Sequence, residues 1–97
     1  MKKQEALDSL AAHRNEMVSR FKIKRLAIFG STARDEAGPD SDVDLLVEFE
    51  GPATFDGYMG LKLFLEELLH TNVDLVTPPS VRPRMRPFIE KDLINAA

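Results

Sequence analysis

Apolar residues recur at helical spacing in the first twenty positions, with Lys, Glu and Arg between them. This pattern predicts an amphipathic helix from about Lys3 to Arg20. Its apolar stripe would consist of Leu7, Leu10, Ala11, Met17, Val18 and Phe21. A second helix is predicted from about Gly57 to His70, with Asp56 as its N-cap. Its inner stripe would consist of Tyr58, Leu61, Leu65, Leu68 and Leu69. The segment from about Arg82 to Ile94 is the last predicted helix.

Three short β-rich stretches separate these helices, and turn residues bound them. The predicted strands run from Ile23 to Phe29, from Asp42 to Phe49 and from Val73 to Thr77. Residues 30–34 are predicted to form a turn into a brief helix, residues 38–41 a turn, and the prolines at 78 and 79 the end of the third strand. This order predicts an α+β fold, with helices packed against a small mixed sheet of three to four strands. At 97 residues, the chain is expected to be a single domain spanning residues 1–97.

Composition narrows the chemistry. Thirteen Lys and Arg against sixteen Asp and Glu give a net charge of −3, which argues against direct binding of nucleic acid by a basic surface. The chain contains no Cys, so disulfides and Cys-ligated zinc are excluded. No apolar run approaches the roughly 18 residues of a membrane span, so we expect no membrane contact and a cytoplasmic location. Eleven carboxylates and a single base, Lys62, lie between Asp35 and Asp74, and basic ends flank this acidic middle.

Two of those carboxylates occupy alternate positions of the second predicted strand. Side chains alternate between the faces of a strand, so Asp42 and Asp44 point the same way, with α-carbons roughly 6.5–7 Å apart. The opposite face would carry Val43, Leu45, Val47 and Phe49. The carboxylates repel each other and lose hydration there, which costs free energy unless a cation compensates their charge. Oxygen ligands without His or Cys favour Mg²⁺, or Mn²⁺ in its place.

Asp74 lies in the third predicted strand and faces away from the apolar residues beside it. If that strand neighbours the second, Asp74 could complete a three-carboxylate cluster, which suits a two-metal site for phosphoryl transfer. Gly30 and Ser31 follow the first strand, where backbone N–H groups can approach a phosphate closely. Arg34, one turn later, can add positive charge to the same oxygens.

Competing motifs fail on their own requirements. Residues 40–44 fit the first ligands of a calcium-binding EF-hand loop, but Leu45 and Gly51 occupy positions that require Gly and Glu. No Walker P-loop is present, and Ser31 lacks the setting of a serine nucleophile. His13 and His70 are expected to be surface residues rather than metal ligands.

The combined pattern resembles the minimal nucleotidyltransferases of the DNA polymerase beta superfamily, which are antitoxins paired with HEPN-domain toxins. The family pattern is Gly-Ser-x-Ala-Arg, a spacer, Ser-Asp-x-Asp-Leu and a later strand Asp. The matching residues are Gly30, Ser31, Ala33, Arg34, Ser41, Asp42, Asp44, Leu45 and Asp74. The tail that starts at Val73 is also similar, so the resemblance spans nearly the whole chain. One departure is Asp35, where the family commonly has Gly.

The resemblance implies a polymerase-beta-like nucleotidyltransferase fold and an activity. ATP would be the substrate, two Mg²⁺ ions the cofactors, and a Tyr of a cognate HEPN toxin the acceptor of AMP. Asp42, Asp44 and Asp74 would hold the metals, and Asp74 could instead accept the proton of the attacking hydroxyl. Gly30, Ser31, Arg34 and Ser41 would bind the nucleotide.

Two other functions stay open at this point. The chain could be a non-catalytic antitoxin that neutralises a toxin by complex formation, or a metal-dependent hydrolase of nucleotides. A homo-oligomer is a further expectation. Three bases at alternate positions, Arg82, Arg84 and Arg86, are either solvated or positioned to meet an acidic partner or the triphosphate.

Overall fold

Among the residues that the structure describes, the sheet is mixed, with four strands in the order β3-β2-β1-β4. The structure, a computed structural model, describes residues 1–38 and 41–96. Strand β1 (Ile23–Phe29) pairs antiparallel with β2 (Val43–Phe49) and with β4 (Ile94–Asn95). Strands β2 and β3 (Val73–Val76) are parallel, joined by a helical crossover. The α+β class and the small mixed sheet are therefore as predicted, and the strand bounds differ by at most one residue.

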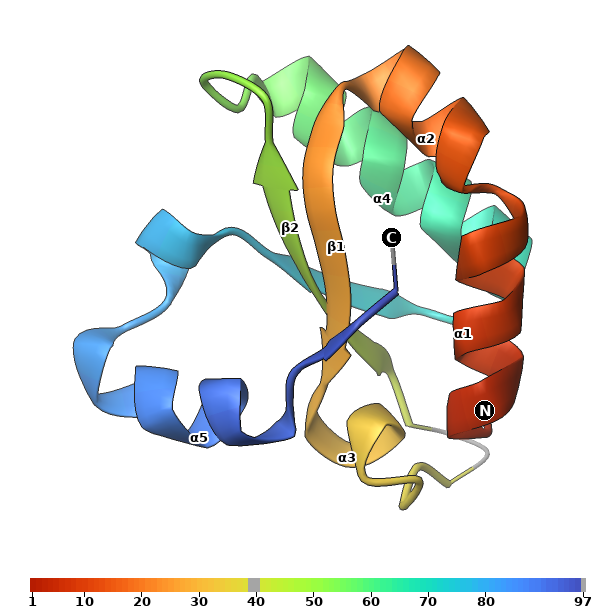
Figure 1. The fold of residues 1–97 in the computed structure, drawn as a ribbon, viewed down its shortest axis with the longest axis vertical. Helices are drawn as coiled ribbons and strands as arrows, with labels where there is room; N and C mark the ends of the chain where they lie inside the picture. The colour runs from red at the N-terminus through yellow and green to blue at the C-terminus, as the bar shows by residue number, and fades with distance from the viewer. Residues whose placement is uncertain (39–40, 97) are drawn as a thin grey trace.

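Three helices cover one face of the sheet, and helix α5 (Arg86–Asp92) lies on the other (Figure 1). The covering helices are α1 (Lys3–Ala12), α2 (Arg14–Phe21) and α4 (Phe55–Leu69). The short helix α3 (Gly30–Ala33) follows β1 directly, as expected. None of the helices among the described residues combines the length and apolar character needed to cross a bilayer.

The predicted single N-terminal helix is wrong, because the chain breaks it at His13. This residue leaves helical geometry, with φ −111° and ψ 13°, and its ring Nδ1 lies 2.9 Å from the Ser9 carbonyl oxygen. The buried positions nevertheless keep helical spacing across the break, because Leu10 and Met17 are seven residues apart. Leu10 and Met17 remain buried, while Ala11 and Val18 face solvent and Ala6 takes an inner position.

The predicted N-cap of the crossover helix is also wrong. Helix α4 begins at Phe55, and Thr54 caps it by accepting the Gly57 N–H at Oγ1 over 3.0 Å. Thr ranks below Asp as an N-cap residue but is still a preferred one, and it stands only two positions before Asp56. Asp56 lies in the first turn instead, where its charge complements the helix dipole. Of the predicted inner stripe, Leu61, Leu65 and Leu69 are buried.

The predicted last helix is divided into shorter elements. After β3 come two 3₁₀ turns, η1 (Pro78–Ser80) and η2 (Pro83–Met85), and then α5 (Arg86–Asp92). Ile94, predicted as a helix end, instead pairs with Ile28 in β4. Pro87 stands at the start of α5, where its missing N–H costs no hydrogen bond. The predicted turn at residues 38–41 includes Pro39 and Asp40, which lie outside the described residues.

The core lies between the sheet and its covering helices. Val43, Leu45 and Val47 of β2 are buried there, as their alternation predicts, and Phe49 packs at the margin. They contact the inner residues of β1, β3, α2 and α4. The opposite face of β2 carries Asp44, Leu46 and Glu48, so the strand separates the core from the polar face.

Candidate active site

Strand pairing brings two of the predicted carboxylates together. In the parallel β2–β3 pair, Asp44 and Asp74 are direct partners in the register. Paired residues on neighbouring strands share a face and lie about 4.8 Å apart. Asp74 is exposed and Asp44 is half-buried. Asp74 was expected to join the other carboxylates if the third strand neighbours the second, and it does.

Asp42 lies immediately before β2 and is exposed to solvent. It is close enough to Asp44 for its charge to act on that carboxyl group. Burial, followed by the charges of Asp74 and Asp42, raises the pKa of Asp44 to about 6. Arg34 acts in the opposite direction and lowers it. The carboxylates therefore form an electrostatically strained group that a cation would relieve.

Gly30 lies directly against this group. Its backbone has φ +67°, a conformation that L side chains rarely adopt. A Cβ added at Gly30 would overlap Asp44 Oδ2 and lie 3.2 Å from Asp44 Cγ. The register explains the proximity, because Phe29, the residue before Gly30, pairs with Asp44. Glycine is thus required here by both backbone conformation and space.

The two serines of the predicted site occupy different environments. Ser31 lies at the start of α3 and is half-buried, and its carbonyl oxygen accepts the Glu36 N–H over 2.8 Å. Ser41 Oγ accepts the Gly38 N–H over 3.1 Å, immediately before Asp42. Ser41 therefore has a role in shaping the backbone before the carboxylates.

Arg34 connects α3 to the C-terminal helix. Its Nη1 lies 2.6 Å from Asp92 Oδ2 in α5, and its Nε lies 3.2 Å from Glu36 Oε2. Hydrogen bonds to Asp92 and Glu36 raise the pKa of Arg34 above its ordinary value. The predicted phosphate-binding arginine is thus also the link that holds α5 beside α3. Sequence reasoning missed Asp92, which carries no local signal because its partner is 58 positions away.

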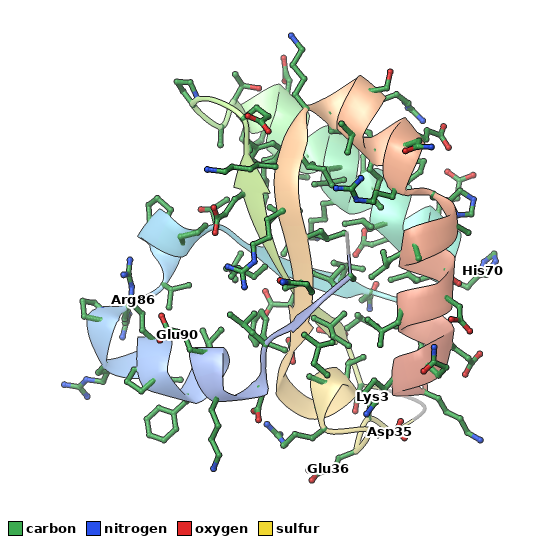
Figure 2. The ribbon with its side chains drawn as sticks, in the orientation of Figure 1. Lys3, Asp35, Glu36, His70, Arg86 and Glu90 are labelled. Atoms are coloured by element: carbon green, nitrogen blue, oxygen red, sulfur yellow. The ribbon has the colours of Figure 1, made fainter. Side chains whose placement is uncertain are left out.

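Asp35 occupies the position where the family commonly has Gly. Its φ is +59°, in the left-handed region that glycine adopts without strain. Its Oδ1 accepts the Lys3 N–H over 2.9 Å, at the N-terminus of α1 (Figure 2). An acidic side chain there satisfies a free helical N–H and offsets part of the backbone cost. The aspartate therefore ties α1 to the loop that follows α3.

The residues present suit a cation that also binds phosphate. Among the described residues, no three acidic, His or Cys side chains converge closely enough to enclose an ion by themselves. Mg²⁺ commonly takes only one or two carboxylates and completes its coordination with water and substrate phosphates. The paired Asp44 and Asp74, with the raised pKa of Asp44, match that incomplete donor set.

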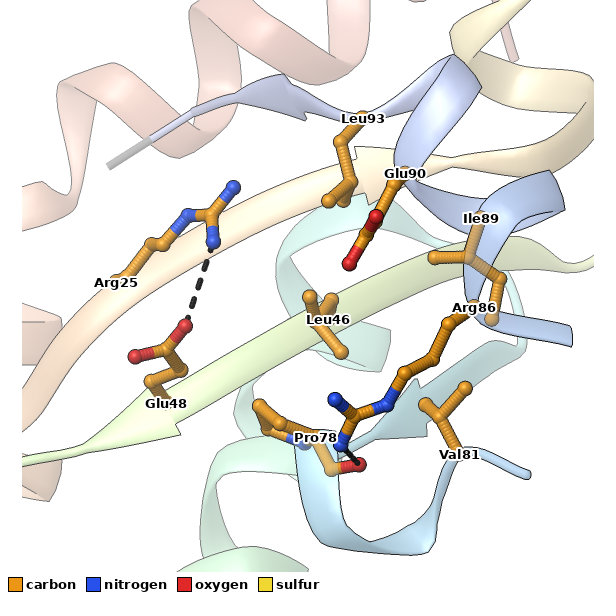
Figure 3. Close-up of a pocket in the computed structure, with 9 residues that line it drawn as sticks. All are labelled: Arg25, Leu46, Glu48, Pro78, Val81, Arg86, Ile89, Glu90 and Leu93. Atoms are coloured by element: carbon orange, nitrogen blue, oxygen red, sulfur yellow. Dashed lines mark hydrogen bonds and ion pairs between the residues drawn. The ribbon is translucent and has the colours of Figure 1, made fainter. Parts of the chain in front are cut away.

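A cavity of about 540 Å³ lies under α5, on the face of the sheet that carries Asp44. Leu46, two residues beyond Asp44, forms part of its wall, and Ile89 and Leu93 lie across it (Figure 3). Arg25 Nη1 pairs with Glu48 Oε1 at 3.3 Å on one side. The predicted basic trio is exposed, and Arg86 Nη2 donates to the Pro78 carbonyl oxygen over 3.5 Å. This cavity was not predicted, because it forms between segments distant in sequence.

Comparisons with known proteins agree with this arrangement. Residues 10–96 match the nucleotidyltransferase domain family. The protein adenylyltransferase MntA of Thermococcus cleftensis is 36% identical over 85 residues, which cover 88% of this chain and 86% of the relative. A solved structure provisionally named a minimal nucleotidyltransferase is 39% identical, with a TM-score of 0.75, and the match covers 97% of this chain and 95% of that one.

A more distant match extends the fold comparison. A chain from the complex of the tri-AMPylated Shewanella oneidensis HEPN toxin with its MNT antitoxin has a TM-score of 0.66. The match covers 94% of this chain and 71% of that one, at 16% identity. At this identity the likeness shows the fold alone.

Proposed function

The chain belongs to the nucleotidyltransferase domain family, and from this premise we propose that it is a metal-dependent protein adenylyltransferase acting as an antitoxin. ATP would donate AMP to a hydroxyl group, and the acceptor would be a Tyr of a HEPN-domain partner toxin. The cytoplasmic location and a homo-oligomer stay predictions.

One observation carries this proposal: the register that pairs Asp44 with Asp74 beside Gly30. It combines ligands for a hard cation with a backbone that phosphate can approach. The relative from Thermococcus cleftensis is named for protein adenylylation, and the Shewanella oneidensis complex is described as an AMPylated HEPN toxin with an MNT antitoxin. Both descriptions refer to AMP attached to a protein, which is the transfer proposed here.

In the proposed reaction, the acceptor oxygen forms a bond to the α-phosphorus of ATP. The bond from that phosphorus to the oxygen bridging to the β-phosphate breaks, and pyrophosphate leaves with its electron pair. Bound Mg²⁺ ions would neutralise the phosphate charge during this exchange. Asp42 and Asp44 would hold the ions together with phosphate oxygens.

The other residues have positioning and proton-transfer roles. Asp74 is exposed and directly beside Asp44, so it can help to hold a second ion or accept the proton of the attacking hydroxyl. Gly30 and Ser31 would present backbone N–H groups to the triphosphate. Arg34, already at the edge of this group, would add positive charge to the phosphate oxygens.

The experiment mixes the chain with its HEPN partner, Mg²⁺ and ATP, and measures the partner by mass spectrometry. We expect the partner to gain AMP and the solution to gain pyrophosphate rather than orthophosphate. The Asp42→Asn/Asp44→Asn variant should lose transfer by at least about 10³-fold, because metal ions contribute several kcal/mol to the barrier. Asp56→Asn/Glu67→Gln removes the same charge from exposed positions of α4 and is the matched control.

The Asp42→Asn/Asp44→Asn variant, called the carboxylate variant, also tests the main alternative, a non-catalytic antitoxin. If the carboxylate variant still abolishes the growth inhibition caused by the partner, neutralisation is by complex formation and not by transfer. If ATP yields orthophosphate and an unmodified partner, the chain is a hydrolase. Either result would contradict the proposal.

A further inference from the structure

Two exposed apolar side chains stand close to the proposed phosphate-binding turn. Phe88 in α5 is 68% exposed, and Met85 in η2 is 45% exposed. Both line a pocket of about 390 Å³ together with Gly30 and Arg34. Within the part of the chain that the structure describes, Phe88 takes part in neither of the two aromatic pairs, which join Phe64 to His13 and to Phe21. The exposed ring is therefore free to receive a ligand.

The pocket is built between two segments that an ion pair holds together. Phe29, Gly30 and Arg34 form one side, and the η2–α5 segment forms the other. The 2.6 Å contact between Arg34 Nη1 and Asp92 Oδ2 spans it, and Asp92 is mostly buried. The ion pair thus joins the two sides of the pocket, whose volume is within the range of small-molecule sites.

Its chemistry suits an aromatic ring attached to an anion. The wall is mainly apolar, with Phe88, Met85 and Ile89 on one side. Two basic residues, Arg34 and Lys91, also line it, together with Asp92, the ion-pair partner of Arg34. A base stacked on an aromatic side chain gains affinity whatever its sequence identity, because every base presents a π-face. Phosphate bound at Gly30 would be at the edge of the same pocket.

We propose that Phe88 and Met85 form the nucleobase subsite of the nucleotide bound at Gly30, an inference that rests on the proposed function. Phe88 stacks on the base, and Met85 contacts its edge. The larger cavity under α5 is a weaker choice for the base, since neither Gly30 nor Arg34 lines it and the charged pair Arg25–Glu48 does. Phe88 is then a base-binding residue on a segment that the nucleotidyltransferase motif does not include.

The test compares two ligands that differ only in the nucleoside. Isothermal titration measures the affinity of wild-type chain and Phe88→Ala for ATP and for inorganic tripolyphosphate, both with Mg²⁺. We expect Phe88→Ala to weaken ATP binding about 10-fold, within the range of base–aromatic stacking, and to leave tripolyphosphate binding unchanged. Phe88→Tyr keeps the ring and should keep the ATP affinity.

The matched control is Phe55→Ala, which removes a ring that is 77% exposed on α4. It should alter neither affinity, and thermal melts should show both alanine variants folded. Equal ATP affinity in Phe88→Ala and wild type would overturn the subsite, whether or not that variant binds the protein partner less tightly. Equal weakening of both ligands would also overturn it. Wild-type chain that binds neither ligand would instead refute the proposed function, and the subsite with it.

Discussion

On one face of the sheet, β2 places Val43, Leu45 and Val47, which are almost fully buried under three helices. On the other face the same strand places Asp44, Leu46 and Glu48, beneath a short helix that buries none of its own residues. The first face is a continuous apolar core. The second has cavities of about 540 and 390 Å³ on the two sides of α5.

This difference separates what stabilises the chain from what it does. Burial of apolar area contributes roughly 25 cal/mol per Å², so the covered face supplies the stability. The other face opposes folding, because burial and like charge disfavour the ionised form of Asp44. A domain of 97 residues can tolerate this unfavourable free energy only because its other face is a continuous apolar core.

The largest expected effect on stability comes from the core face. Leu45 is fully buried in β2, one residue from Asp44. Leu45→Ala should lower the free energy of unfolding by about 2–5 kcal/mol, since it removes buried methyl groups and leaves a cavity. Urea denaturation measures the change. A loss similar to that of an exposed control, Leu63→Ala, would contradict the division between the faces.

On the face that carries Asp44 and Asp74, substitutions should change the rate of adenylyl transfer rather than the stability of the fold. Asp74→Asn should slow adenylyl transfer at least about 10²-fold, because a positioned base or metal ligand is lost. ATP affinity and the melting temperature should change little, since Asp74 is exposed. Single-turnover assays and titration separate the two quantities. Transfer at the wild-type rate would remove Asp74 from the site.

Substitution of Gly30 should affect both the stability of the fold and the binding of Mg²⁺ with ATP. Gly30→Ala should cost about 1–2 kcal/mol of stability, from a left-handed backbone that now carries a Cβ. It should also displace Asp44, which the new Cβ would overlap, and so weaken binding of Mg²⁺ with ATP. Gly51→Ala, at a position with open space around it, is the matched control. Equal melting temperatures and affinities in both variants would show that the close approach is unimportant.

The smallest effect tests the cost of the carboxylates directly. The pKa of Asp44 is about 6 in the folded chain and about 3.9 when unfolded, so the folded state binds the proton more tightly. Metal-free wild type should therefore lose stability as the pH rises from about 4 to about 6. Asp44→Asn should remove this loss and be more stable by about 1 kcal/mol at pH 8, after allowance for partial exposure. Melts in chelator, at pH 4 and pH 8, check the difference. A wild type no less stable at pH 8 than the variant would contradict it.

Local pattern was sufficient for much of the fold. The bounds of β1 follow from an apolar β-rich run that ends at Gly30, and the alternation in β2 assigns Asp44 and Leu45 to opposite faces. From the sequence, Asp74 could join the other carboxylates only if the third strand paired with the second. That pairing depends on the crossover through α4, which no local pattern predicts.

What could not be predicted depends on contacts between distant positions. Asp35 bonds to Lys3 across 32 positions, and Arg34 to Asp92 across 58. The pocket beside Gly30 exists because α5 lies against α3. Phe88 lines this pocket, but the sequence around it indicates only a C-terminal helix. The break at His13 was missed for a different reason, since the residues around it have no helix-breaking character.

The parallel pairing of Asp44 with Asp74 also determines when the site can form during folding. Hairpin-like contacts between β1 and β2 are available early, whereas a parallel pair requires closure of a long crossover. The two carboxylates are 30 positions apart, and their repulsion acts against the docking of β3. A chain that has formed its hairpin but not this docking has no paired carboxylates to bind an ion. Competence for catalysis therefore requires the docking of β3 and is absent from a chain that has formed only its hairpin.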